Sequence, residues 1–166
     1  MTLAEAAAQA AALAERGAER ELADLRAQWA DELEAAIRSP DFRERVVAYQ
    51  AVGQFRFKAK TELLRRGLED ESPACRGAAL LSLAALSKES PGLVNAVRPL
   101  LHRMADGDPN QAVRRLTIVC LGHGSPQRET IVLLEGIAHD DEAEKQLRET
   151  ARATAAALKK RAAAKS

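Results

Sequence analysis

The sequence has few of the residue types that build β-sheets. Its 166 residues include three Phe, one Tyr and one Trp, with only eight Val and four Ile. Because strands favour aromatic and β-branched side chains, an all-β fold is all but excluded. The chain is rich instead in the two strongest helix formers, with 35 Ala and 21 Leu, and we therefore predict an all-α fold.

The sequence also has no long apolar run, little net charge and only two cysteines, and each of these features excludes some classes of function. No apolar run approaches the roughly 18 residues of a membrane-spanning helix, so no membrane association is expected. Lys and Arg number 25 and Asp and Glu 24, a balance that argues against a strongly basic nucleic-acid binder. The N-terminus has no early Lys or Arg, unlike a secretory signal, so we expect a cytoplasmic protein. Cys75 and Cys120 belong to no CxxC pair and are expected to be small buried hydrophobes; no metal or cofactor is expected.

Proline placement divides the chain into expected helices. Five of the six prolines follow Ser or Asp, which predicts a helix start at each pair. The sixth, Pro99, is expected to kink the helix that contains it, and Gly17 is a candidate break in the first helix. The pairs are Ser39-Pro40, Ser72-Pro73, Ser90-Pro91, Asp108-Pro109 and Ser125-Pro126. The expected helices are 3–38, 40–53, 57–69, 73–88, 91–105, 109–121, 126–138 and 141–162.

Four segments of the chain repeat one pattern. Each has a Leu-bearing helix end, a turn with an acid or Ser-Pro, an arginine and a run of small and apolar residues; the segments are 33–55, 64–86, 100–122 and 133–155. Their arginines are Arg45, Arg76, Arg114 and Arg148, separated by 31, 38 and 34 residues. This spacing is typical of stacked helical hairpins. In the sixth helix the expected buried stripe is Val113, Leu116, Ile118, Val119 and Leu121.

The turns give the pattern a family likeness. Residues 106–116 (DGDPNQAVRRL) and 69–76 (EDESPACR) resemble HEAT-like repeats of the subtype named PBS-lyase HEAT-like, with weaker copies at 39–46 and 140–148. The resemblance covers residues 33–158 and implies a short α-solenoid of about four HEAT-like helical hairpins. The repeat-turn residues are expected to be structural, each arginine reaching a neighbouring turn acid: Asp70, Arg76, Asp106, Asp108, Arg114, Asp140 and Arg148.

Residues 1–38 fall outside the clear repeats. Leu22, Leu25, Trp29, Leu33 and Ile37 form an amphipathic stripe, which predicts a capping helix over the first repeat or a helix that binds a partner or a second copy. The segment 2–16, nearly all Ala, Glu and Gln, is expected to fray or project. We accordingly divide the chain into an N-terminal helical cap, 1–38, and a HEAT-like repeat domain, 39–166.

Charge is the one functional signal. In repeats of this kind the second helices line the concave face, and here they carry an excess of cations in the middle of the array. The candidate partner-binding residues are Lys58, Lys60, Arg65, Arg66, Arg98, His102 and Arg103. No catalytic set is found, so we expect a non-catalytic scaffold that binds the acidic surface of another protein. The alternatives are binding of a phosphate backbone by the same patch and, from the family resemblance, a bilin lyase-like enzyme.

Overall fold

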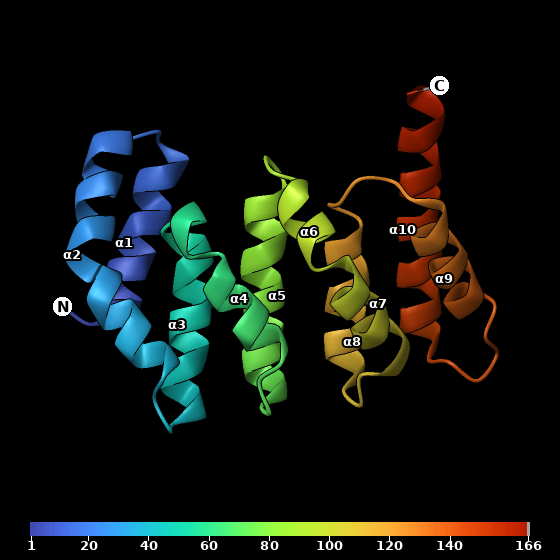
Figure 1. Cartoon of the computed structure of the whole chain (residues 1–166), viewed down its shortest axis with the longest axis horizontal. Helices are drawn as coiled ribbons and strands as arrows, with labels where there is room; N and C mark the ends of the chain where they lie inside the picture. The colour runs from blue at the N-terminus through green and yellow to red at the C-terminus, as the bar shows by residue number, and fades with distance from the viewer. Residues whose placement is uncertain (166) are drawn as a thin grey trace. The chain divides into compact units, whose positions relative to one another are not determined.

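Helices account for nearly all regular structure in the computed structural model, which describes residues 1–165 (Figure 1). Across this range the chain forms α-helices and one short 3-10 turn and contains no strand, so the predicted all-α fold is confirmed. The described helices include none that is long and apolar enough to cross a membrane. The chain divides into two compact units, residues 1–86 and the part from Ser87 onward, and each is described by itself.

The first unit contains two helical hairpins and the helix that follows them. Helix α1 (Leu3–Glu15) pairs with α2 (Glu19–Ile37), and α3 (Phe42–Gln54) packs on both. The 3-10 turn η1 (Lys58–Lys60) leads into α4 (Glu62–Leu68), and α5 (Pro73–Ser87) follows. The break between α1 and α2 lies at Gly17, as anticipated, because its φ of 69° is in the left-handed region that glycine adopts without strain.

The N-terminal helix is packed, contrary to the expectation for residues 2–16. A capping box fixes its start, in which Thr2 and Glu5 exchange side-chain and backbone bonds. Ala6, Ala7 and Ala10 are fully buried. Their small side chains allow helices to approach closely, and so part of the alanine excess builds the core of this unit.

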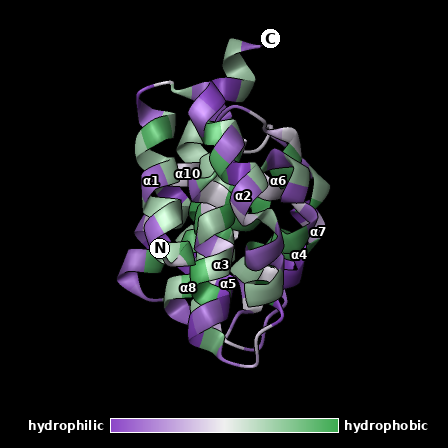
Figure 2. Ribbon diagram, turned by 90° about the vertical axis from the view of Figure 1, so that its left-hand side faces the viewer, coloured by the Kyte–Doolittle hydropathy of each residue, from purple (hydrophilic) through white to green (hydrophobic). Residues whose placement is uncertain are grey.

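The second unit is also built of packed helices. Helices α6 (Gly92–Ala96) and α7 (Arg98–Gly107) are followed by α8 (Gln111–Leu121), α9 (Arg128–Ala138) and α10 (Lys145–Ala164). Helix α8 contacts α7 and α10, and α10 contacts α9. Figure 2, coloured by hydropathy, shows that the helices carry both hydrophilic and hydrophobic residues, as amphipathic packing requires.

Three sequence expectations about local structure are wrong. Pro99 does not kink a helix; the chain breaks at Val97, and Pro99 lies in the first turn of α7, where its missing N–H is not needed. Only Ser72-Pro73 directly begins a helix, whereas α3 and α8 are capped by Asp41 and Asn110 after their prolines. In the expected stripe of α8, Leu116 is half-buried and Val119 is 44% exposed, so neither lies fully within the packed face of this helix.

Candidate functional site

The repeated turns share one hydrogen-bond motif. Asp70, Asp108 and Asp140 each accept the backbone N–H of the residue two positions later, at 2.9, 2.9 and 3.0 Å. Ser39 does the same for the N–H of Asp41 at 3.1 Å. These local bonds stabilise a turn without the helical geometry of the flanking residues. The turns therefore have equivalent structures, as the sequence alignment predicted.

The repeat arginines hold these turns in place. Arg45 forms two bonds with the carboxylate of Asp70, Nε–Oδ2 at 2.9 Å and Nη2–Oδ1 at 3.1 Å. The two side chains are only 12% and 8% exposed. The Nη1 of Arg45 also donates to the carbonyls of Ser39 and Pro40. Arg45 thus connects its own turn to the turn aspartate of the next repeat. The sequence pattern predicted that a repeat arginine reaches a neighbouring turn acid in this way.

The other repeat arginines vary in their partners. Nη1 of Arg76 donates to the carbonyls of Asp70 and Glu71 at 3.0 and 3.2 Å, and Nε of Arg114 to that of Ala105 at 2.8 Å. The Nε of Arg148 is buried with no acceptor among the described residues. Asp106, expected in a turn, lies instead in the last turn of α7.

The expected partner-binding residues of the first unit lie on η1 and α4. Lys58, Arg65 and Arg66 are exposed. Lys60 is more enclosed, since its Nζ lies 2.6 Å from Oε1 of Glu34 and 5.6 Å from the centre of the Phe57 ring. Among these residues, Arg65 and Arg66 present their charge most openly.

Arg65 and Arg66 line an open groove of about 650 Å³ within the first unit. Arg38, at the end of α2, joins them there, although its position in the expected N-terminal cap gave no sign of this in the sequence. Four carboxylates also line the groove: Glu62, Glu69, Asp70 and Glu71. Arg45 engages Asp70 closely and reaches Glu71 at 4.0 Å. Within residues 1–165, no ion pair of 4.0 Å or less joins Arg38, Arg65 or Arg66 to a carboxylate, although Arg38 lies near enough to Glu34 to lower the pKa of that side chain. The four arginines and four carboxylates of the lining balance in charge, so the groove presents exposed guanidinium groups without a net positive charge.

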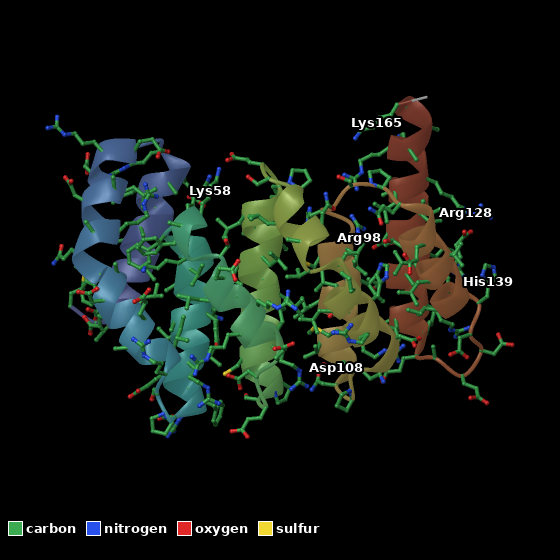
Figure 3. The ribbon with its side chains drawn as sticks, viewed as in Figure 1. Lys58, Arg98, Asp108, Arg128, His139 and Lys165 are labelled. Carbon is green, nitrogen blue, oxygen red and sulfur yellow. The ribbon has the colours of Figure 1, made fainter. Side chains whose placement is uncertain are left out.

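The expected site residues of the second unit are not equivalent to one another. Arg98, marked in Figure 3, is only 5% exposed. Its guanidinium donates to the hydroxyl of Thr130 at 2.9 Å, to the carbonyl of Ser125 at 3.1 Å and to the side chain of Asn95. The charge of Arg98 is therefore committed to the interior of this unit and is not available to a partner.

His102 belongs to the same interior network. Its Nε2 lies 2.9 Å from the hydroxyl of Thr130, which also accepts from Arg98. Burial lowers the pKa of His102, and the nearby Arg98 lowers it further, while Glu129 opposes both. Burial and the neighbouring arginine both favour the neutral form of the ring. Of the expected residues in this unit, Arg103 alone is exposed.

The two cysteines show no sign of reactivity. Both are buried, and burial raises the pKa of the Cys120 thiol to about 12. A thiol in that state is a poor nucleophile, because the thiolate is the reactive form. In the part of the chain that the structure describes, no three His, Cys, Asp or Glu side chains gather as a metal site would require.

Comparison with known families finds a similarity over part of the chain. The family model of HEAT repeats matches residues 30–106. This segment is similar to HEAT repeats, and the match covers less than half of the chain. The match is to HEAT repeats in general and does not distinguish the PBS-lyase subtype. No curated protein and no solved structure matches the chain significantly. The Asp108 and Asp140 turns lie beyond the matched HEAT segment and have the same hydrogen bond as the Asp70 turn within it.

Proposed function

We propose that the protein is a non-catalytic interaction module whose first unit binds an acidic segment of another protein. HEAT repeats commonly serve as protein-interaction scaffolds. The observation that supports this use is the groove beside α4, where Arg38, Arg65 and Arg66 are exposed and unpaired within the described chain. Guanidinium groups pair with carboxylates in two-pronged hydrogen bonds, which recognise acidic side chains specifically.

The groove suits an extended segment better than a compact ligand. It is open to solvent, and its charged side chains come from the end of α2, from α3, from α4 and from the turn after α4. Glu62 and Glu69 line it as well. These carboxylates would repel a nucleic acid, which carries a negative charge at every phosphate. They would favour a protein segment whose acidic side chains lie opposite the three arginines. This mixed lining supports a protein partner over a phosphate backbone.

Charge reversal tests the proposal. The triple variant Arg38→Glu, Arg65→Glu, Arg66→Glu should lose the proteins that the wild-type chain captures by site-specific photo-crosslinking from a position beside the groove. A matched control, Arg16→Glu, Arg20→Glu, Arg128→Glu, changes the net charge equally at exposed positions outside the groove and should retain them. Capture of the same proteins by the triple variant would show that the groove is not the binding site.

A titration distinguishes a nucleic acid from a protein at this groove. Labelled duplex DNA should show no saturable binding at low salt. Binding that weakens steeply with added salt and is lost in the triple variant would instead assign the groove to a phosphate backbone.

A further inference from the structure

A second groove of the first unit has a mostly apolar lining, whereas the lining of the arginine groove is mostly charged. It has a volume of about 670 Å³ and lies where the start of α1, the end of α2 and the start of α3 meet. Its apolar lining comes from Leu3, Ala4, Ala35, Ala36 and Val47. It shares no lining residue with the arginine groove beside α4. The two grooves are therefore separate sites on one unit.

Small residues create this groove. Ala4 and Ala35 are exposed, while Leu3 behind them is buried, so a larger side chain at either alanine would occupy the space. The groove accordingly has room for an apolar side chain from outside the unit. Burial of such a side chain would be favourable, because it removes apolar surface from water on both partners.

The rim of the groove is acidic. Glu32 and Glu44 line it, together with a single cation, Arg43. Arg43 is already bound to Asp41, with Nε–Oδ1 and Nη2–Oδ2 distances of 3.2 and 3.3 Å. The helical hairpin behind the rim adds to the negative potential, since residues 1–37 contain eight acidic and three basic side chains. The charge around the groove is thus complementary to a cation.

We propose that this groove binds a basic amphipathic segment of a partner protein. One apolar side chain of the segment fills the space over Leu3, Ala35 and Val47, and its flanking Lys or Arg side chains face Glu32 and Glu44. Unlike the proposed acidic partner, this ligand is positively charged, and it binds beside the N-terminal hairpin of α1 and α2. The N-terminal hairpin then serves for binding in addition to covering the first repeat.

Three versions of one short fluorescent peptide test the proposal by anisotropy with the full chain. The first carries two leucines flanked by lysines, the second has the lysines replaced by glutamates, and the third has the leucines replaced by serines. The first peptide should bind saturably and more tightly than the other two. Equal binding of the lysine and glutamate versions would overturn the assignment of a basic ligand.

Matched tryptophan variants locate the binding. Ala35→Trp fills the groove and should weaken the lysine–leucine peptide by about tenfold or more, as overfilling of a packed space does. Ala23→Trp, at an exposed position of the same helix that does not line the groove, should leave binding unchanged. Glu32→Lys should weaken binding by about two- to fivefold, the range of an exposed ion pair. Thermal unfolding of each variant verifies that the fold is retained.

The outcomes separate this proposal from the function proposed above. The arginine triple variant should bind the lysine–leucine peptide as the wild type does, whatever that variant does to an acidic partner. Binding that Ala35→Trp and Ala23→Trp affect equally, or affect not at all, would overturn the groove assignment. Self-association of the chain that Ala35→Trp abolishes would identify the occupant as a second copy and would also overturn the proposal.

Discussion

The turns between repeats are stabilised by individual side-chain contacts. The clearest example is the ion pair between Arg45 and Asp70. We expect Asp70→Asn to lower the free energy of unfolding by about 2 kcal/mol, because it leaves a mostly buried guanidinium without its carboxylate. Urea denaturation at neutral pH measures this change. The control is Asp41→Asn, which alters an exposed ion pair and keeps a good helix cap, and it should unfold at nearly the same urea concentration as the wild type.

The same pair predicts a pH dependence. Burial raises the pKa of Asp70, but the bonds from Arg45 and from the Ser72 N–H lower it more, so the pKa is below its usual value in the folded state. The carboxylate therefore adds stability at pH values above about 4, the unfolded value, and this stability is lost as the pH falls through the folded pKa. The difference in stability between the wild type and Asp70→Asn should accordingly narrow as the pH falls below about 4. A constant difference from pH 7 to pH 3 would contradict the prediction.

Two histidines make stability depend on pH in a range above that of Asp70. Burial lowers the pKa of both His102 and His123, and nearby cations lower each further. Below about pH 6.5 the unfolded chain takes up protons at these rings more readily than the folded chain, so stability should decline as the pH is lowered until both forms are protonated. Denaturation of the wild type at pH 7.5 and 5.5 tests this. The double variant His102→Gln, His123→Gln should lose most of the decline, and an undiminished decline would show that other groups cause it.

At the scale of helices, two glycines have opposite roles. A Cβ at Gly67 in α4 would lie 2.7 Å from Cβ of Ala79 and 2.8 Å from the Tyr49 ring, whereas a Cβ at Gly136 in α9 would meet nothing within 4 Å. Gly67→Ala should therefore destabilise the protein by about 1–3 kcal/mol through overpacking. Gly136→Ala should stabilise it by about 1 kcal/mol, the difference in helix propensity. Melting temperatures that shift in the same direction in both variants would refute this contrast.

Most helices could be predicted from the sequence, but several boundaries could not. Ala and Leu content, glycine breaks and apolar spacing depend on local backbone preferences, so the number and order of the longer helices follow from them. The starts after Pro40 and Pro109 were misplaced, because Asp41 and Asn110 compete as helix caps and lie closer to the first turn. The separation of α6 from α7 depends on the packing of Asn95, Arg98 and Ser125, which sequence spacing does not reveal.

At the scale of the whole chain, the division into two units predicts how damage spreads. Ile118 lies fully buried in the second unit, and Ile118→Asp would bury an unpaired charge at a cost of several kcal/mol. Hydrogen exchange should then lose protection from Ser87 onward while α1–α4 remain protected. Leu80→Asp, in the core of the first unit, should give the reverse pattern. Loss of protection throughout the chain in both variants would show that the two units unfold as one.

The candidate sites were only partly predictable. Arg65 and Arg66, which line the arginine groove, were predicted as partner-binding residues because cations on second helices stand out in the sequence. Arg38 was missed because it ends a helix that seemed to belong to a cap, and the acidic-rimmed groove was missed because alanines in a helix carry no signal of a cavity. Arg98 was grouped with the exposed cations, although its neighbours Asn95, Ser125 and Thr130 satisfy it internally.

The sequence by itself determined that the chain is all-α and that several of its turns repeat one pattern. These properties depend on backbone propensity and on hydrogen bonds between residues close in the chain, such as the bond from the Ser72 N–H to Asp70. The tertiary structure decided which cations remain exposed, which alanines fill a core and which line a groove. Those outcomes depend on which helix faces meet, and that depends on the packing of side chains distant in the sequence.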